Sequence, residues 1–205
     1  MAPLRFNLQG YSYQDGISIL RNSFEAAQEA LHTKREGAMD EAVAYQEGLK
    51  EGTVEWIGER DEDGFVIWDQ QSVLDYNVRD AEEAAKELRK AFCIAMYHHW
   101  ERSALQWVDK VQLKHAGLVA MVEAIPYPVD AKLSDLHLLV NALKHNNAKW
   151  LKQLADKRPD LLMVDLQGER EKVNWYGVIS VRPQHVEEFF DVLTASGPTI
   201  DSVRP

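Results

Sequence analysis

Residues 138–150 read LLVNALKHNNAKW, and this stretch decides how the chain is interpreted. Leu139, Val140 and Leu143 recur at the spacing of one α-helical face, which Leu136 extends towards the N-terminus. The stretch then ends in a run of Asn, Lys and His side chains. It therefore predicts a core helix that ends in a group of side chains capable of chemistry.

The longest helical pattern precedes this stretch and covers residues 70–112. One stripe contains Ala84, Leu88, Phe92, Ala95, His99 and Ser103, and a second contains Cys93, Met96, Trp100, Ala104, Trp107 and Val111. A helix with two such faces is normally central and packed on both sides. The pattern allows a break near Tyr76 and Asn77, with continuous helix from Arg79 onward.

Two further helices are predicted before residue 53. Apolar side chains follow a helical spacing over residues 12–35, and again from Asp40 to about Lys50. Gly37 interrupts the pattern between them. A link this short predicts that the two helices form an antiparallel pair.

Residues 53–69 have a different pattern. The short β-branched and aromatic runs TVEWIG and FVIWD flank the polar run ERDEDG, which contains the turn dipeptide Asp63-Gly64. We expect a β-hairpin here. The alternative is that the preceding helix continues through Trp56.

The C-terminal half predicts several shorter elements. We expect a short helix over Gly117–Val122, a helix capped by Ser134, and a segment from Ala148 to Leu154 that restarts or continues that helix. A last helix should begin at Pro183 and stop at Gly197-Pro198. Residues 161–165 and 175–180 could pair as a second small hairpin.

Charge is unevenly distributed along the 205 residues, whose formal net charge is -10. Residues 1–90 carry a net charge of -9, residues 91–205 carry -1, and residues 132–158 carry +4. An acidic surface repels phosphate backbones, so a DNA-coating role is disfavoured. The local basic segment is compatible with a short or structured RNA, although it could equally be a solvated surface.

Three features that the sequence lacks indicate the cellular location. Cys93 is the only cysteine, so no intrachain disulfide can form and a reducing compartment is favoured. The chain starts with no signal-peptide pattern and has no long apolar run. We expect a cytoplasmic protein without a membrane segment.

His137, Asn141 and His145 form a polar stripe at i, i+4 and i+8 on the predicted helix, with Lys144 beside it. Histidine can transfer a proton near neutral pH, and Lys or Asn can hold a phosphoryl oxygen. These groups suffice for RNA cleavage without a metal. The alternative is a polar helix face with one hydrogen-bonded histidine.

A second polar cluster lies on the long helix, in the run Tyr97-His98-His99-Trp100-Glu101-Arg102. Its simplest interpretation places His99 and Trp100 in the core, with His98, Glu101 or Arg102 pairing with another helix. No HExxH or Cys/His cluster is present, so neither a metal site nor another cofactor is expected.

The segment LVNALKHNN, preceded by YHHWERSALQW, resembles the HEPN superfamily of prokaryotic helical proteins over about residues 80–195. The resemblance implies an up-and-down helical bundle that often dimerises. Many members are metal-independent ribonucleases of toxin–antitoxin or defence systems, and others are RNA-binding or scaffold modules. Asn141 and His145 match the family's polar and histidine positions, but Val140 stands where the family has arginine.

The sequence thus predicts a mainly α, HEPN-like bundle with one or two small β-hairpins. Residues 1–69 would form an N-terminal helical and β-hairpin segment, and residues 70–205 the bundle, unless the whole is one domain. The predicted function is an RNA-associated protein of a defence, toxin–antitoxin or mobile-element system. Its catalytic candidates are His145, Asn141 and Lys144, with support from Arg102, Glu101 and His98. We expect a homodimer, with a cognate toxin or antitoxin protein as a further partner. The alternative function is a non-catalytic interaction or antitoxin-like scaffold module.

Overall fold

The computed structural model describes residues 6–145, 147–163 and 174–202. Helices dominate it, and its only sheet within those residues has two strands, so the predicted helical bundle with a small β-hairpin is confirmed. The elements are α1 (Leu8–Glu51), β1 (Gly58–Arg60), β2 (Val66–Asp69), α2 (Gln70–Trp107), α3 (His115–Ala124), α4 (Leu133–His145), α5 (Ala148–Lys157), the 3-10 helix η1 (Pro159–Leu161) and α6 (Pro183–Thr194).

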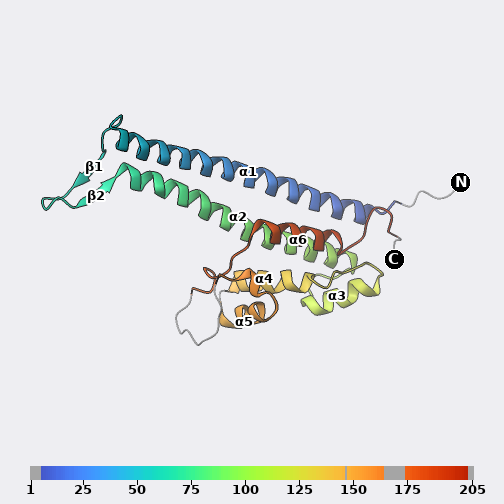
Figure 1. The fold of residues 1–205 in the computed structure, drawn as a ribbon. Coiled ribbons are helices and arrows are strands. Elements are labelled where there is room, and N and C mark those ends of the chain that lie inside the picture. The colour runs from blue at the N-terminus through green and yellow to red at the C-terminus, as the bar shows by residue number, and fades with distance from the viewer. Residues whose placement is uncertain (1–5, 146, 164–173, 203–205) are drawn as a thin grey trace. The chain divides into compact units, whose positions relative to one another are not determined.

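The chain forms two compact units (Figure 1). The bundle unit contains Met1–Phe24 and Arg89–Pro205, and the hairpin unit contains Glu25–Leu88. The division falls inside the long helices α1 and α2. None of the helices among the described residues is long and apolar enough to cross a membrane.

α1 is one uninterrupted helix of 44 residues, so the predicted antiparallel pair of helices split at Gly37 is wrong. A glycine inside a helix costs about 1 kcal/mol relative to alanine, which is small beside the hydrogen bonds that a break would lose. Two cross-helix ion pairs, Lys34–Asp80 and Arg35–Glu82, hold the segment around Gly37 against α2 at N–O distances of 3.0 and 2.7 Å. Contacts with α2 therefore help to keep α1 continuous through Gly37.

The predicted β-hairpin is confirmed, and the alternative of a helix through Trp56 is wrong. β1 and β2 pair antiparallel, with Gly58 opposite Asp69 and Glu59 opposite Trp68. Gly64 adopts a φ of 85° in the turn, a conformation that glycine reaches without strain.

α2 starts directly after the hairpin and runs without the break that the sequence pattern allowed near Tyr76 and Asn77. The Asp69 carboxylate accepts a hydrogen bond from the Ser72 backbone N–H at 2.7 Å and thereby caps the helix. The helix therefore begins at Gln70, where the predicted pattern over residues 70–112 begins, and it is continuous by Arg79 as expected.

The core of the bundle unit follows the second predicted stripe of α2. Cys93, Met96, Trp100, Ala104 and Trp107 are buried, together with apolar faces of α4 and α6. Each fully buried large apolar side chain contributes about 1.5–3 kcal/mol, so these buried faces together stabilise the unit. The predicted last member, Val111, lies beyond the end of α2 and is 98% exposed.

The N-terminal part of α1 is tied to the end of α6 within the bundle unit. The Tyr13 hydroxyl bonds to the backbone oxygens of Leu193 and Ser196, at 2.7 and 2.9 Å. Helix carbonyls at a C-terminus lack partners within their own helix, so a buried tyrosine satisfies them here. α6 begins at Pro183 as predicted and ends three residues before Gly197.

Two local predictions around α4 and the C-terminal segments need correction. α4 begins at Leu133, so Ser134 lies inside the helix and is not its cap. The predicted second hairpin is reduced to a single antiparallel bridge between Leu162 and Ile179. Most of the connection between those two residues lies outside the described part of the chain.

Candidate functional site

Three helices of the bundle unit bring polar aromatic side chains together. The imidazole rings of His115 at the start of α3 and His137 on α4 stack with centroids 4.1 Å apart and planes 10° apart. The Tyr97 hydroxyl on α2 lies 3.1 Å from His115 Nδ1, and Ser134 Oγ lies 3.3 Å from His115 Nε2. We call Tyr97, His115, Ser134, His137 and Asn141 the histidine cluster.

The helical spacing on α4 brings Asn141 to His137. Its amide Nδ2 lies 2.8 Å from His137 Nε2 and donates to the His137 backbone oxygen at 2.9 Å. An amide N–H can only donate, so the neutral imidazole must accept at Nε2 and carry its proton on Nδ1. Asn141 therefore sets the tautomer of His137 and is not itself open to a ligand through this group.

The surroundings keep both imidazoles neutral. Burial, aided by the charge of His137, lowers the pKa of His115 to about 4. Burial also lowers the pKa of His137, where Glu101 acts in the raising direction and Lys144 in the lowering direction. Burial and the Glu101 carboxylate raise the pKa of Tyr97. At neutral pH the cluster thus contributes proton acceptors and no positive charge.

Positive charge lies instead at the exposed end of α4 and the start of α5. Lys144 and His145 are exposed and make no hydrogen bond or ion pair with any described residue. The His145 ring stacks towards Trp150 at a centroid distance of 6.4 Å, and Lys149 Nζ lies 5.2 Å from the Trp150 ring centroid. We call Lys144, His145, Lys149 and Trp150 the basic edge.

The basic edge borders the histidine cluster and is held in place by a helix cap. Trp150 makes an edge-on contact with His137 at a centroid distance of 6.1 Å. The Asn147 side chain accepts a hydrogen bond from the Trp150 backbone N–H at 3.2 Å, which starts α5. The predicted alternatives for this segment are thus decided: α5 is a new helix.

The supporting residues predicted on α2 divide into two groups. His98 Nδ1 lies 3.1 Å from a Glu101 carboxylate oxygen, within the same helix and not with another helix as predicted. Arg102 is exposed, and its charge acts on His99 by lowering that residue's pKa. His99 belongs to a different contact, because its Nε2 lies 3.0 Å from the Tyr13 backbone oxygen. Glu101 is therefore near the histidine cluster, and Arg102 is not a member of it.

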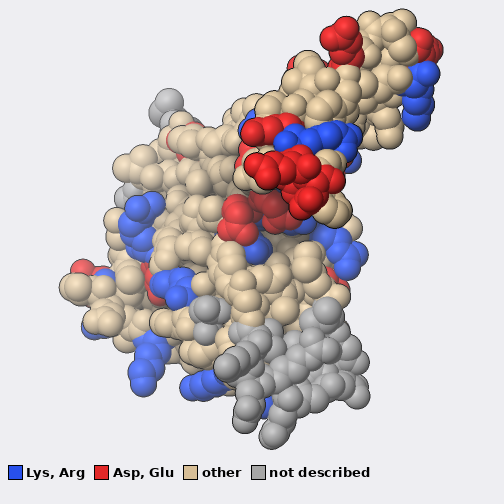
Figure 2. Space-filling model, turned by 90° about the vertical axis from the view of Figure 1, so that its left-hand side faces the viewer, with Lys and Arg blue, Asp and Glu red and all other residues tan. Residues whose placement is uncertain are grey.

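Val140 is 1% exposed and forms part of the core face of α4. The position at which the resembled family has an arginine therefore points away from solvent. The local cations that remain available are Lys144 and Lys149, on the basic edge. Figure 2 shows one face of the molecule, on which some Lys and Arg side chains lie beside acidic side chains and others are separated by uncharged surface.

No group of three His, Cys, Asp or Glu suited to a metal ion exists within residues 6–145, 147–163 and 174–202. Cys93 is fully buried, and burial raises the pKa of its thiol, so it behaves as a small apolar side chain. The groups that the site offers are imidazole, amide, ammonium and aromatic side chains.

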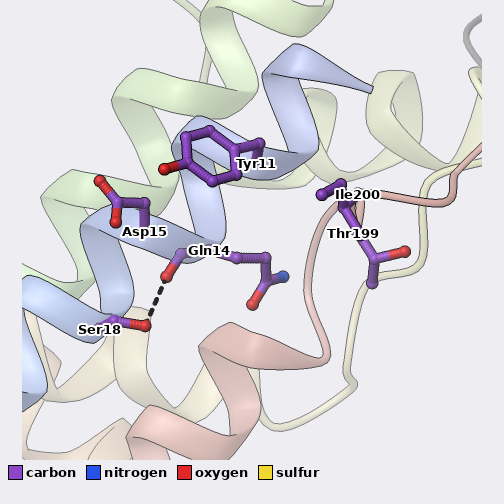
Figure 3. A pocket seen from close by; sticks show the side chains of 6 residues that line it. All are labelled: Tyr11, Gln14, Asp15, Ser18, Thr199 and Ile200. Carbon is purple, nitrogen blue, oxygen red and sulfur yellow. Dashed lines mark hydrogen bonds between the residues drawn. The ribbon is translucent and has the colours of Figure 1, made fainter. Parts of the chain in front are cut away.

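A hollow of about 380 Å³ lies elsewhere in the bundle unit, between α1 and residues 199–200 (Figure 3). The Gln14 amide, on its wall, already donates to the backbone oxygens of Thr194 and Pro198. Ser18 bonds to the Gln14 backbone oxygen of its own helix, as drawn in Figure 3. The Gln14 amide and the Ser18 hydroxyl are thus used in holding the chain together, and the hollow is separate from the histidine cluster and the basic edge.

Sequence reasoning missed His115 as a member of the site. It lies 22 residues before His137, at the start of a different helix, and belongs to no motif with fixed spacing. Tyr97 and His137 belonged to stretches that the sequence singled out, but only packing shows that they meet. The histidine at the end of α4, which the motif highlights, is the one outside the cluster.

Comparisons of the chain with models of protein families, with curated proteins and with solved structures found no match. The HEPN resemblance therefore depends on the short α4 motif. The other observations that bear on function are the side chains of the site.

Proposed function

We propose that this chain is a HEPN-like protein that binds RNA at the basic edge. The observation that supports the proposal is the exposure of Lys144 and His145 beside Trp150, with neither side chain in a hydrogen bond or ion pair to a described residue. Ammonium groups pair with phosphates, and an indole ring stacks on an unpaired base. The basic edge offers both kinds of contact, because its residues come from the last turn of α4 and the first turn of α5.

The preferred ligand is unpaired RNA in a loop or single strand. Base stacking requires a base that is free of a helix, and a small group of cations covers only a few phosphates. α5 extends the positive surface with the exposed Lys152 and Lys157, against one exposed carboxylate, Asp156. An extended duplex would need a broader basic surface than this edge provides.

Binding of a labelled unpaired oligoribonucleotide, followed by fluorescence anisotropy, tests the proposal. We expect Lys144→Gln combined with Lys149→Gln to weaken binding about tenfold and to flatten the salt dependence by roughly 0.7 per lost phosphate contact. Lys110→Gln changes an exposed lysine that lies just beyond the end of α2 and is the control. An equal loss of affinity in the control variant would mean that binding is non-specifically electrostatic, and would contradict binding at the basic edge.

Trp150 provides an independent test of the stacking contact. Trp150→Ala should weaken binding by about 1–3 kcal/mol, whereas Trp150→Phe keeps an aromatic face and should recover most of the affinity. Because Trp150 is half-buried against His137, melting curves of both variants are needed to separate binding from folding.

A second candidate function is metal-independent cleavage of the bound RNA, favoured by the exposed imidazole of His145 beside Lys144. His145 would take the proton of a ribose 2′-hydroxyl as the 2′-oxygen bonds to phosphorus. The bond from phosphorus to the 5′-oxygen then breaks, and that oxygen takes a proton from water. Lys144 would neutralise the phosphorane oxygens.

Cleavage of total RNA or tRNA in the presence of a chelator separates the two candidates. Wild type should leave 2′,3′-cyclic phosphate ends and His145→Ala should not. Equal cleavage by both proteins, or none by either, removes the catalytic candidate and leaves RNA binding untouched.

The resemblance carries three further parts of the proposal. The chain would form a homodimer, act in the cytoplasm within a defence, toxin–antitoxin or mobile-element system, and have a cognate toxin or antitoxin protein as partner. Light scattering on a size-exclusion column measures the dimer directly. A monomer at micromolar concentration would contradict that part.

A further inference from the structure

The hairpin unit ends in a β-ribbon whose large apolar side chains are exposed on both faces. Phe65 is 70% exposed and Ile67 is 61% exposed, and every residue of β2 except the last is exposed. Successive strand residues point to opposite faces, so neither face of the ribbon is covered by the rest of the hairpin unit. The exposed apolar residues of this ribbon tip are Val54, Trp56, Ile57, Phe65, Val66, Ile67 and Trp68.

Several side-chain hydrogen bonds hold the ribbon tip in one conformation. The Asp61 carboxylate accepts hydrogen bonds from the backbone N–H groups of Asp63 and Phe65, at 3.0 and 2.8 Å. Arg60 donates to the Gly64 backbone oxygen at 2.8 Å, with its guanidinium 4.8 Å from the Trp56 ring centroid. An apolar surface that is already ordered loses little conformational entropy on binding.

The base of the ribbon is also fixed to the helix before it. The Ile57 backbone N–H donates to the Tyr45 hydroxyl at 2.9 Å, and that hydroxyl donates to the Glu55 backbone oxygen at 3.3 Å. An isolated two-stranded ribbon is marginally stable in water. These hydrogen bonds to Tyr45 therefore stabilise the ribbon and fix its tip relative to α1. Exposed apolar patches of this kind mark interaction sites.

The net charge of the hairpin unit restricts which kinds of partner can bind the ribbon tip. The hairpin unit carries 18 Asp and Glu against 6 Lys and Arg, a net of -12, whereas the bundle unit carries 15 against 17, a net of +2. Acidic residues surround the ribbon: Glu51, Glu55, Glu59, Asp61, Glu62 and Asp63. This charge repels nucleic acid, an anionic membrane and the same tip of a second copy.

We infer that the ribbon tip docks on another protein whose surface has an apolar groove rimmed by Lys and Arg. The apolar residues of the ribbon would fill the groove, and the acidic rim would pair with the basic one and speed the encounter. This surface belongs to a different unit from the basic edge and is independent of the proposed RNA binding.

A first experiment uses a synthetic amphipathic helix as the probe, with leucines on one face and lysines on the other. Binding to the full chain is measured by fluorescence anisotropy. The triple variant Phe65→Ser, Ile67→Thr, Trp68→Ser should weaken binding at least tenfold. The double variant Ile19→Gln, Met39→Gln removes exposed apolar side chains from α1 and should change binding less than twofold.

Two altered probes test the charge and the apolar contact separately. A peptide with glutamates in place of the lysines, and one with serines in place of the leucines, should both bind at least tenfold more weakly. Equal loss in the α1 control variant, or equal binding of the glutamate peptide, would overturn the inference. Circular dichroism should show unchanged helix content in the triple variant, because its three side chains lie outside the core.

A second experiment identifies the partner's chemistry. A photo-cross-linking amino acid replaces Phe65 in the full chain, with Met39 as the control position, and cross-linked peptides are identified by mass spectrometry. The expected product is a peptide of a different protein that is rich in Lys and Arg and enriched at position 65. Cross-links to a second copy, to lipid, to RNA or to an acidic protein surface would overturn the inference, as would an equal yield at both positions. RNA binding of the triple variant should remain unchanged in either case.

Discussion

His115 and His137 stack ring on ring, 4.1 Å between centroids, although they come from two different helices. Two protonated imidazoles at this distance would repel each other, and partial burial disfavours the charge of each. The contact therefore requires neutral rings. It joins the start of α3 to α4, and the hydroxyl of Tyr97 extends it to α2.

The first prediction follows from the pKa values of this pair. In the unfolded chain both histidines titrate near 6.5, whereas in the folded protein the pKa of His115 is about 4 and that of His137 is also lowered. As the pH falls below about 6.5, the unfolded chain binds protons that the folded protein does not. The free energy of unfolding should therefore fall between pH 6.5 and 4.

The variant His115→Phe keeps an aromatic ring against His137 and removes one titrating group. It should lower the slope of unfolding free energy against pH in this window, as measured by urea unfolding at several pH values. The Asp160 carboxylate does not account for this window, because the Arg158 hydrogen bond lowers its pKa below the ordinary value. An unchanged slope between pH 6.5 and 4 would contradict the assigned cause.

The second prediction concerns Arg158, which joins three segments of the bundle unit. Its guanidinium lies 2.8 Å from Asp160 of η1, 2.8 Å from Glu188 of α6 and 3.8 Å from Asp135 of α4. The side chain is 12% exposed, and its loss leaves the mostly buried Asp135 carboxylate without its guanidinium partner, while Glu188 keeps its ion pair with Lys132. We expect Arg158→Met to lower the free energy of unfolding by about 2 kcal/mol.

An exposed ion pair provides the comparison for Arg158. Lys34 and Asp80 are each about half exposed, so Lys34→Gln should change stability by less than roughly 0.5 kcal/mol. Arg158→Lys should fall between the two, because an ammonium cannot make the paired contacts of a guanidinium. A loss for Arg158→Met as small as that for Lys34→Gln would show that the network contributes little.

The third prediction compares two glycines inside α1. A Cβ at Gly16 would overlap the His99 imidazole, whereas one at Gly37 would meet nothing within 4 Å. Gly16→Ala should therefore destabilise the protein by about 1–3 kcal/mol through overpacking. Gly37→Ala should stabilise it by about 1 kcal/mol, because alanine is the better helix former.

Thermal unfolding followed by circular dichroism measures both glycine variants. A stabilising effect of Gly16→Ala would mean that His99 moves aside freely, against its 3.0 Å contact with the Tyr13 backbone oxygen. Destabilisation by Gly37→Ala would contradict the uninterrupted helix at that position.

The fourth prediction tests the cap that positions the basic edge. Asn147→Ala removes the acceptor for the Trp150 backbone N–H and should cost about 1 kcal/mol of stability. Asn147→Ser keeps an acceptor and should cost less than half as much. Urea unfolding gives the stability change, and RNA affinity should fall further in the alanine variant than in the serine variant if α5 frays.

Local order was largely predictable from the sequence because it depends on neighbours a few residues apart. The 3.6-residue pattern placed α4 with its buried Leu136, Leu139 and Leu143, and Pro183 marked the start of α6. Short β-branched and aromatic runs on either side of a polar run with Asp63-Gly64 predicted the hairpin. The same local signals placed Asn141, Lys144 and His145 at the end of one helix.

Only the tertiary structure decided which of these side chains act together. The stacking of His115 on His137 depends on the packing of α3 against α4, and no spacing rule connects residues in separate helices. Packing likewise turned Ser134 from a predicted cap into a partner of His115 and left Arg102 outside the site. The sequence by itself determined a helical protein with a polar end on α4. Long-range packing determined that a neutral histidine cluster lies behind an exposed basic edge, because burial and contacts between helices depend on how the whole unit packs.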